Sequence, residues 1–413
     1  MNSGDTAFVI VCAALVLFMT PGLAFFYGGL VRRKNVVNTL MSCLTIMGIV
    51  TVLWCTVGYS LSFSEGNGFI GGLNWAFFNG IGMNDPSPYA GGIPHYVFIA
   101  FQMMFAIITP ALMIGSVVGR MKFKAIFFIV LIWMFLVYFP ICHMVWGKGG
   151  FLNELGAVDF AGGFVVHISS AVSGLVLAII LGRRKGYTTV RYNVHNIPFV
   201  VLGAGMLWFG WLGFNAGSSL AADGLAAHAF MTSCISAGAG MMSWIIIDVI
   251  KTGKPTLVGA STGLVVGLAS VTQGSGFVPV WAAFIIGAAA GPVCYFGVKL
   301  IKNRFNIDDS LDVFGCHGLG GMWGCIATGL FAQTAINGCA QWNGLVFGET
   351  GLFSAQMAGM GITIALAVAG TLAAAGIVRI FMKLRVTDME EREGLDKSQH
   401  GEKAYPSFNG FDD

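Results

Sequence analysis

Two histidines stand out because they lie in stretches that are otherwise glycine, small and aliphatic. His167 lies in DFAGGFVVHISS, residues 159–170, and His317 lies in DVFGCHGLGG, residues 312–321. A neutral imidazole has one donor and one acceptor nitrogen, so two facing rings could guide a small polar solute or relay a proton. In the alternative interpretation, the rings only satisfy hydrogen bonds between neighbouring helices. Ionisable residues inside a membrane are rare and usually functional, which favours a pore.

An aspartate precedes each histidine. Asp159 lies eight residues before His167, and Asp312 lies five residues before His317. An aspartate at a helix start is typical of an N-cap, which accepts free backbone N–H groups and is favoured by the helix dipole. We expect capping as the direct role of Asp159, and its charge could add negative potential at the pore mouth. Eight helical residues would place His167 about 12 Å deep, near the middle of a 30 Å core.

The elements that position these residues are predicted to be transmembrane helices. The 413 residues are 56% hydrophobic and 10% charged, with a mean hydropathy of +0.78, far from the soluble average. The apolar blocks are long enough to cross a hydrocarbon core, and too long and continuous for barrel strands. The sequence predicts an all-α integral membrane protein. Eleven helices are expected, over residues 8–30, 36–61, 96–118, 125–145, 160–182, 197–217, 225–250, 257–272, 278–300, 314–333 and 353–383.

The basic residues predict the orientation of these helices. Of the 22 Lys and Arg residues, all but Lys148 fall on one side of the predicted topology. By the positive-inside rule that side is the cytoplasm, so the N-terminus is outside and the C-terminus inside. The N-terminal segment MNSGDTAFVIV lacks the basic region of a signal peptide, so we keep residues 8–30 as the first helix.

The topology also indicates an internal repeat. Five helices precede the basic loop at 183–191, so a second set of five would be inverted relative to the first. His167 and His317 each lie seven residues before a glycine, Gly174 and Gly324, which supports this 5+5 inverted repeat. The predicted divisions are a transmembrane domain over 1–385, with repeat 1 at about 8–182, repeat 2 at about 197–333 and helix eleven at 353–383, and a cytoplasmic regulatory tail over 386–413.

Several function classes are not expected. The predicted cytoplasmic loops carry no Walker A or dinucleotide motif and are too short for a nucleotide-binding domain. Eight of the nine cysteines fall within predicted helices, so no disulfide framework is expected. We expect neither an enzyme nor a binder of nucleic acid, with no cofactor, no metal and no catalytic residue.

Six segments resemble the ammonium transporter family (Amt/Mep/Rh), and they occur in the family's order. The segments are FMTPGLAFFYGGLVRRKNVVN, AFQMMFAIITPAL, ICHMVWGKGG, DFAGGFVVHISSAVSGL, GWLGFNAGS and DVFGCHGLGG. The sequence is more similar to the bacterial and archaeal Amt branch than to the Rh branch, mainly because of HMVW and the tail. The resemblance implies eleven helices with a five-plus-five inverted repeat, assembled as a homotrimer with one pore per subunit in the cell membrane.

The resemblance also implies roles for single residues. The substrate site at the outer mouth is expected at Phe101, Phe105, Trp146 and Ser218, and the gate beneath it at Phe105 and Phe214. His167 and His317 are expected to line the narrow pore. Without this context, one of 34 phenylalanines is usually a core or lipid-facing residue, and Trp146 would be an interface anchor.

The residue types suit ammonium, or methylammonium as its analogue. Ammonium is a compact cation with four donors, so aromatic faces can recover about 2 kcal/mol by cation–π attraction while a serine hydroxyl accepts a hydrogen bond. A potassium ion cannot donate a hydrogen bond to the serine hydroxyl. Moving a charge to mid-membrane costs at least about 3 kcal/mol, and loss of the proton removes most of that cost. Met103, Met104 and Cys316 depart from the family pattern without removing a motif residue.

The charged C-terminal tail allows two interpretations. The charged segment EEREGLDKSQHGEKAYPSF has the composition of a disordered end, yet EREGLD and HGEKAY resemble the tail that couples subunits and binds a PII-type (GlnK-like) regulator.

Two other functions were considered. A channel for another small neutral solute would not need an aromatic cage with a hydroxyl. An ammonium sensor would need a cytoplasmic output, and no fused signalling domain is expected after residues 353–383.

Overall fold

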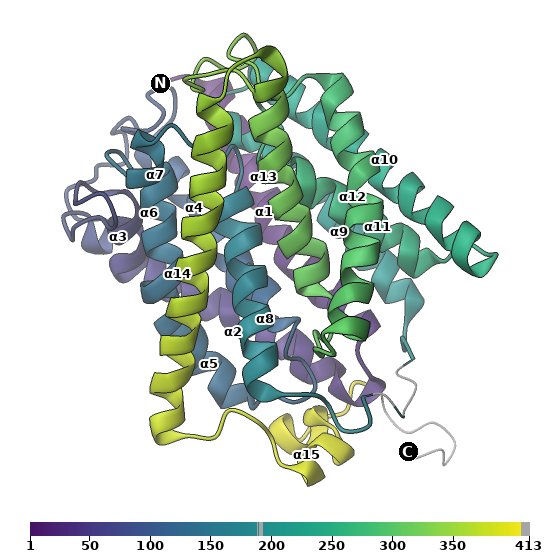
Figure 1. The fold of residues 1–413 in the computed structure, drawn as a ribbon. Coiled ribbons are helices and arrows are strands. Elements are labelled where there is room, and N and C mark those ends of the chain that lie inside the picture. Colours follow the sequence, from purple (N-terminus) through teal and green to yellow (C-terminus); the bar gives the residue numbers. More distant parts are fainter. Residues whose placement is uncertain (188, 190–192, 406–413) are drawn as a thin grey trace.

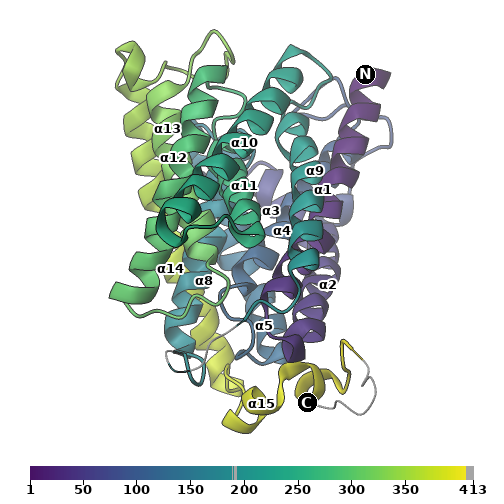
Figure 2. The same ribbon diagram turned by 90° about the vertical axis from the view of Figure 1, so that its right-hand side faces the viewer.

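The computed structural model describes residues 1–187, 189 and 193–405, and its long helices lie side by side in one bundle (Figures 1 and 2). Arg191 of the predicted basic loop and residues 406–413 of the predicted tail lie outside the described residues. The long helices are α1 Ser3–Leu30, α2 Val36–Leu53, α4 His95–Ile114, α5 Phe123–Trp133, α8 Ser169–Leu181, α9 Ile197–Ala216, α10 Gly224–Thr252, α11 Leu257–Val271, α12 Val280–Lys299, α13 Leu319–Phe331 and α14 Gly351–Phe381. The shorter helices are α3 Tyr59–Phe63, α6 Phe139–Trp146, α7 Phe151–Glu154 and α15 Asp388–Glu393.

Two of the predicted helices continue through a turn of π-helix. The π-helical turn η2, Trp54–Gly58, joins α2 to α3, and η4, Met134–Tyr138, joins α5 to α6. A π-helical turn inserts one extra residue into the helix and so changes which side chains face a given neighbour. The predicted helices over 36–61 and 125–145 are therefore present as composite helices.

The helices agree with a membrane protein. Within the described residues, nine helices are long and apolar enough to cross a bilayer. The predicted helices at 257–272 and 314–333 are also present, as α11 and as the π-helical turn η8, Phe314–Gly318, followed by α13, but both are shorter. The all-helical membrane class is thus confirmed, while eleven crossings and the orientation stay predictions.

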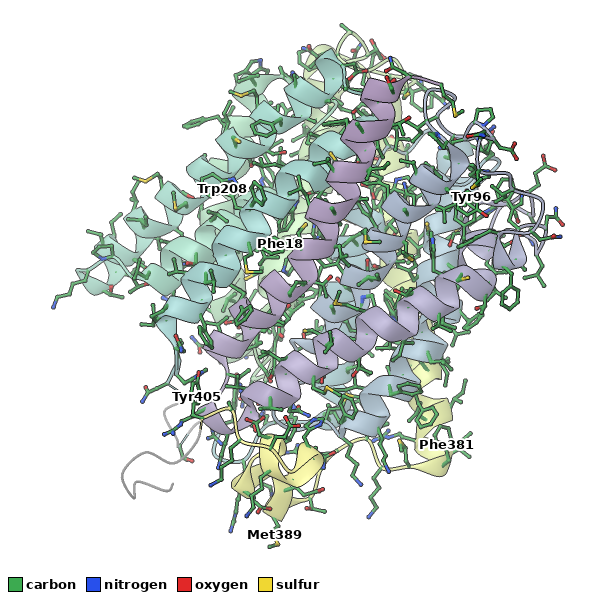
Figure 3. All side chains as sticks on the ribbon, turned by 180° about the vertical axis from the view of Figure 1, so that it is seen from behind. Phe18, Tyr96, Trp208, Phe381, Met389 and Tyr405 are labelled. Atoms are coloured by element: carbon green, nitrogen blue, oxygen red, sulfur yellow. The ribbon has the colours of Figure 1, made fainter. Side chains whose placement is uncertain are left out.

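The two described ends of the chain lie at opposite ends of the bundle (Figures 1 and 2). The end that holds residue 1, predicted to be external, is here called the outer end, and the end that holds α15 is called the inner end. Figure 3 shows Phe18 and Phe381 on the outside of the bundle, where their side chains are exposed, as expected for contact with lipid.

Small residues let the helices approach closely. On α12, a Cβ added at Gly287 would lie 2.2 Å from the carbonyl oxygen of Ser236 on α10. On α9, a Cβ at Gly203 would lie 2.3 Å from the backbone nitrogen of Phe26 on α1. Such contacts between backbones are typical of helix association in membranes. They also bring α1 and α9, the first helices of the two predicted repeats, side by side.

A buried ionic cluster joins three loops at the inner end. The Arg184 guanidinium donates from Nε and Nη2 to the Asp308 carboxylate, at 2.9 and 2.6 Å, and fully buried Arg120 donates to the Asp308 carbonyl at 2.5 Å. Burial lowers the pKa of Arg120 to about 10, against the opposing charge of Asp308. Burial by itself would raise the pKa of Asp308, but Arg184 and Arg120 hold it below its usual value.

The described part of the tail is folded against these loops. The Val386 amide donates to the Arg120 carbonyl at 3.0 Å, and the Leu395 amide donates to Asn35 Oδ1 at 3.0 Å. A capping box at Thr387 begins α15, and the π-helical turn η10, Asp396–His400, follows it. Of the two interpretations of this segment, the disordered end does not apply to residues 386–405.

Candidate functional site

Three aromatic side chains gather near the outer end of the bundle. Phe101 and Phe105 lie one turn apart on α4, with ring centroids 4.9 Å apart, and Trp146 ends α6. The Trp146 ring meets the Phe105 ring nearly perpendicularly, with centroids 5.8 Å apart. The indole N–H of Trp146 donates to the Asp159 carbonyl at 2.8 Å, which fixes the ring. Trp146 remains partly exposed, whereas both phenyl rings are buried.

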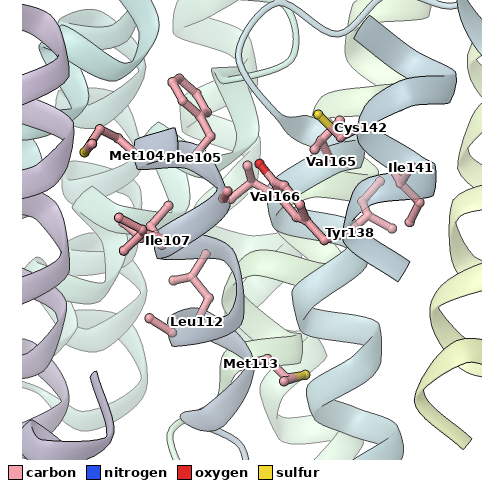
Figure 4. Packing of buried hydrophobic residues seen from close by; sticks show 14 of the residues in the cluster. Met104, Phe105, Ile107, Leu112, Met113, Tyr138, Ile141, Cys142, Val165 and Val166 are labelled. Carbon is pink, nitrogen blue, oxygen red and sulfur yellow. The ribbon is translucent and has the colours of Figure 1, made fainter. Parts of the chain in front are cut away.

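A second pair of aromatic rings closes the space beneath this cluster. The Phe105 and Phe214 centroids are 4.2 Å apart, with an angle of 30° between the ring planes, and both side chains are buried. One turn after Phe214, the Ser218 hydroxyl donates to the Phe214 carbonyl at 2.8 Å. Since that bond uses the hydroxyl proton, the oxygen of Ser218 stays available as an acceptor. Figure 4 shows Phe105 above Val166 and Leu112, among buried side chains of α4, α6 and the π-helical turns that hold Tyr138 and Val165.

The two histidines face each other below the phenyl pair. His167 lies in the π-helical turn η5, Gly163–Ile168, and His317 lies in η8. Their rings are nearly parallel, at 17°, with centroids 5.3 Å apart. The Phe214 centroid lies 6.2 Å from that of His167. The rings of Phe105, Phe214, His167 and His317 therefore follow one another from the outer end inward.

A narrow cavity runs beside both imidazoles. Apart from these two rings, its wall is formed by apolar side chains and one indole. The lining residues are Met19, Leu23, Ile108, Leu112, Val166, His167, Leu207, Trp211, Phe214 and His317. Within the described part of the chain, neither nitrogen of His167 nor Nδ1 of His317 has a hydrogen-bond partner. Buried polar atoms are almost always paired, so these nitrogens are available to a solute in the cavity.

Asp159 serves as a cap for the segment that carries His167. One carboxylate oxygen accepts from the amides of Gly162 and Gly163, both at 2.7 Å, and the other accepts from Phe164 at 2.7 Å and Val165 at 3.3 Å. Four backbone N–H groups that the helix cannot satisfy are thereby paired. The carboxylate is itself buried, so the cap also fixes where the π-helical turn begins.

The structure assigns the equivalent cap before His317 to Asp309 rather than to Asp312. Asp309 lies eight residues before His317, the same spacing as from Asp159 to His167. Its Oδ2 accepts from the Phe314 amide, five residues later, as Asp159 Oδ2 accepts from the amide five residues later. Asp312, which the sequence analysis paired with Asp159, instead forms an ion pair with Lys302 at 2.7 Å.

Two further residues of the site were missed by the sequence analysis. Trp211 stacks on His167 with centroids 5.3 Å apart and 26° between planes, and its indole N–H donates to Thr272 at 2.8 Å. It lies three residues before Phe214, so helical spacing alone could have placed it on the same face. Asp309 could have been found from its eight-residue spacing to His317.

Comparisons with known proteins cover nearly the whole chain. A family model for the Ammonium Transporter Family matches residues 7–405. An ammonium transporter of Bacillus subtilis (strain 168) is 47% identical over 405 residues, which cover 98% of this chain and 99% of that protein. The crystal structure of Saccharomyces cerevisiae Mep2 matches with a TM-score of 0.87 and 34% identity, over 99% of this chain and 94% of that one. A structure described as a sensor Amt protein matches with a TM-score of 0.85 and 25% identity, over 96% of this chain and 98% of that one.

Proposed function

This chain belongs to the ammonium transporter family, and we propose that it recruits ammonium at the outer aromatic cluster and conducts it as ammonia past the two histidines. The observation that carries this mechanism is the single file of Phe105, Phe214, His167 and His317, with a cavity of apolar wall beside both imidazoles. The family match confirms the resemblance that the six sequence segments indicated.

Recruitment depends on the cation and its N–H groups together. The rings of Phe101, Phe105 and Trp146 offer aromatic faces worth about 2 kcal/mol in a desolvated site, and the Ser218 oxygen can accept one N–H. A potassium ion would gain the cation–π term but could not donate to Ser218. The site therefore favours ammonium over an ion of similar size.

The cavity favours the neutral form of the solute. Its apolar wall would leave a cation without the hydration it loses, at a cost of at least about 3 kcal/mol. Ammonium that gives its proton to water at the outer mouth enters as ammonia, and the unpartnered nitrogens of His167 and His317 can accept a hydrogen bond from it or donate one to it. At least one of the two rings must stay neutral for this role, so that one of its nitrogens keeps a lone pair.

Exchange of the two histidines tests the pathway. His167→Ala and His317→Ala are each expected to lower methylammonium uptake and ammonium-dependent current in reconstituted vesicles. Equal activity in both variants and the parent would contradict the proposal.

The outer aromatic site has its own test. Trp146→Leu is expected to change selectivity and apparent affinity while the amount of folded protein stays the same. Current on a solid-supported membrane at several pH values measures whether the proton crosses with the ammonia.

We also propose a homotrimer in the plasma membrane, regulated at its inner face by a PII-type (GlnK-like) protein. The folded tail supports this regulation, because residues 386–405 pack on the loops of the inner end and would present a fixed surface. Pull-down with a PII protein should depend on residues 386–413, and retention after their deletion would contradict the interaction. Cross-linking in membranes tests the trimer.

An ammonium sensor is the second candidate, because the chain also matches the sensor Amt protein. The two functions differ in flux. Vesicles that contain this chain alone should accumulate methylammonium if it is a transporter. Binding of ammonium without uptake would favour the sensor.

A further inference from the structure

His143 is a buried histidine that the proposed pathway does not use. It lies in the last turn of α6, three residues before Trp146, and its side chain has no exposed surface. Its Nδ1 faces the carbonyl oxygen of Ser62 at 3.1 Å, and its Nε2 faces the carbonyl oxygen of Asn67 at 2.8 Å. Both contacts thus join α6 to the end of α3 and to the turn that follows it.

The two contacts determine the protonation of the ring. A backbone carbonyl only accepts, whereas a neutral imidazole donates from one nitrogen and carries a lone pair on the other. A neutral His143 would therefore direct a lone pair at one of the two carbonyl oxygens. Only the imidazolium, which donates from both nitrogens, satisfies both contacts.

Other histidines of the described chain do not share this arrangement. His195 faces the Val31 carbonyl with Nδ1, but its Nε2 faces the Tyr405 hydroxyl, which can donate to it. His228 faces one carbonyl, that of Val278, with Nε2. Among the described ring contacts, only His143 has a carbonyl oxygen at each nitrogen, so His228 provides a matched control.

The position of His143 also favours a positive charge. The carbonyl groups of the last turn of α6 give the end of the helix a partial negative charge. Within the described residues, neither ring nitrogen has a carboxylate as an ion-pair partner. The titratable groups of α6 and of the segments packed against it are Tyr59, Glu65, Tyr89, Tyr138, Cys142, Lys148, Glu154, Asp159 and His167. Because Asn67 is exposed, the Nε2 side of the ring can exchange protons with the outer solution.

We propose that His143 is an imidazolium that acts as a positioning residue for Trp146. By donating to Ser62 and Asn67, it fastens α3 and the outer turn to α6. The turn is itself ordered, since Asn67 Oδ1 accepts from the amides of Phe69 and Ile70 at 2.9 and 3.0 Å. Loss of the proton removes one of the two contacts and frees the end of α6, on which the Trp146 ring depends. The charge state of His143 does not depend on the proposed function, whereas its effect on substrate affinity rests on that function.

Nitrogen NMR tests the charge state directly. The full chain is labelled with ¹⁵N-histidine and measured in lipid bilayers at pH 7. We expect one imidazolium with both nitrogens protonated, present in the parent and in His228→Gln but absent from His143→Gln. If no histidine is doubly protonated, or if the signal persists in His143→Gln, the proposal is wrong.

Uptake as a function of external pH tests the positioning role. With the inner pH fixed, the apparent KM for methylammonium should rise several-fold as the external pH passes the point at which the NMR signal disappears. His143→Gln keeps two N–H donors on one nitrogen without a charge, so its KM should not change over that range. His143→Leu should have the raised KM at every pH. A pH profile of His143→Gln equal to that of the parent would overturn the role. Parent vesicles without any uptake would instead contradict the proposed function, and the NMR result would still decide the charge.

Discussion

At the level of single residues, the Asp159 carboxylate pairs several backbone donors at once. It is buried, and it pairs four backbone amides at the start of the segment that presents His167. The two carboxylate oxygens share one negative charge, and hydrogen bonds to a charged acceptor are stronger than those to a neutral side chain. The orientation of the His167 ring thus depends on a residue that does not line the cavity.

Asp159→Ala should therefore be costly. Hydrogen bonds to charged groups contribute about 1.5–3 kcal/mol each and are not additive, so we expect a loss of about 3 kcal/mol or more in unfolding free energy. Asp223→Ala is the matched control, because Asp223 caps α10 through one bond, to the Ala226 amide at 2.9 Å, and should cost about 1 kcal/mol. Thermal unfolding in detergent compares the two variants. Equal losses would mean that the Asp159 cap acts like an ordinary one.

Most residues of the candidate site could be predicted from the sequence, but their partners could not. Phe105, Phe214, His167 and His317 were predicted as site residues and do lie together. The proposed protonation of His143 depends on the backbone carbonyl groups of Ser62 and Asn67, and the residue types at those positions do not reveal such contacts. The sequence analysis paired Asp312 with Asp159 and did not consider Asp309, although Asp309 has the matching eight-residue spacing to its histidine; the contacts identify Asp309 as the equivalent cap.

At the level of helices, close approach depends on the absence of single methyl groups. Gly287 on α12 faces the Ser236 backbone on α10, whereas a Cβ at Gly238, also on α10, would meet no atom within 4 Å. A methyl group at Gly287 must push the two backbones apart, and small-to-large changes in tight packing cost about 1–3 kcal/mol.

Gly287→Ala and Gly238→Ala form a matched pair. Gly287→Ala should lower the unfolding temperature, while Gly238→Ala should be neutral or stabilise by less than about 1 kcal/mol, because it restricts the unfolded chain. Thermal unfolding of both purified variants is the measurement. A Gly287→Ala variant as stable as the parent would show that α10 and α12 can separate without cost.

The folded tail predicts a dependence on pH. His400 Nε2 accepts from the Asn38 amide at 3.0 Å, and His195 Nε2 accepts from the Tyr405 hydroxyl at 3.0 Å. Burial lowers the pKa of His400, against the charges of Asp396 and Glu402, and burial also lowers the pKa of His195. His400 of the tail and His195 before α9 therefore bind protons more tightly when the tail is released, and docking should weaken as pH falls below about 6.5.

Hydrogen exchange of residues 395–405 measures this docking. After correction for the intrinsic rate, exchange should be faster at pH 5.5 than at pH 7.5. In His400→Gln the amide oxygen can still accept from Asn38 without titrating, so the difference between the two pH values should shrink. Protection that does not change with pH in the parent would contradict the prediction.

Helix positions were predictable because apolar length and charge determine them, whereas the π-helical turns were not. The turns at Gly163–Ile168 and Phe314–Gly318 carry both histidines, yet nothing in residue type separates them from ordinary helix. The predicted extent of 257–272 agrees with α11 to one residue at its end. The fold of the tail depends on distant partners such as Arg120 and Asn35, so its composition alone favoured disorder.

At the level of the whole molecule, the ends of the bundle differ in chemistry. The inner end holds the ionic cluster of Arg120, Arg184 and Asp308, together with the docked tail. The outer end holds the aromatic cluster and Cys339, an exposed cysteine in a loop between α13 and α14. This asymmetry makes the predicted orientation testable with one reagent.

A membrane-impermeant maleimide should label Cys339 in intact cells if the predicted outer end is external. Cys339→Ser should abolish the labelling, because six of the other eight cysteines are buried and the remaining two, Cys55 and Cys234, are only partly exposed within helices. Labelling that appears only after the cells are permeabilised would reverse the predicted orientation. The amount of protein in the membrane, measured in parallel, excludes a loss of expression.

The contact between the Phe105 and Phe214 rings, 4.2 Å between centroids, has a consequence for ion leakage. Two phenyl groups this close leave no room for a column of water between them, so hydronium and alkali ions would have no continuous wet route along the proposed pathway while the rings stay in contact.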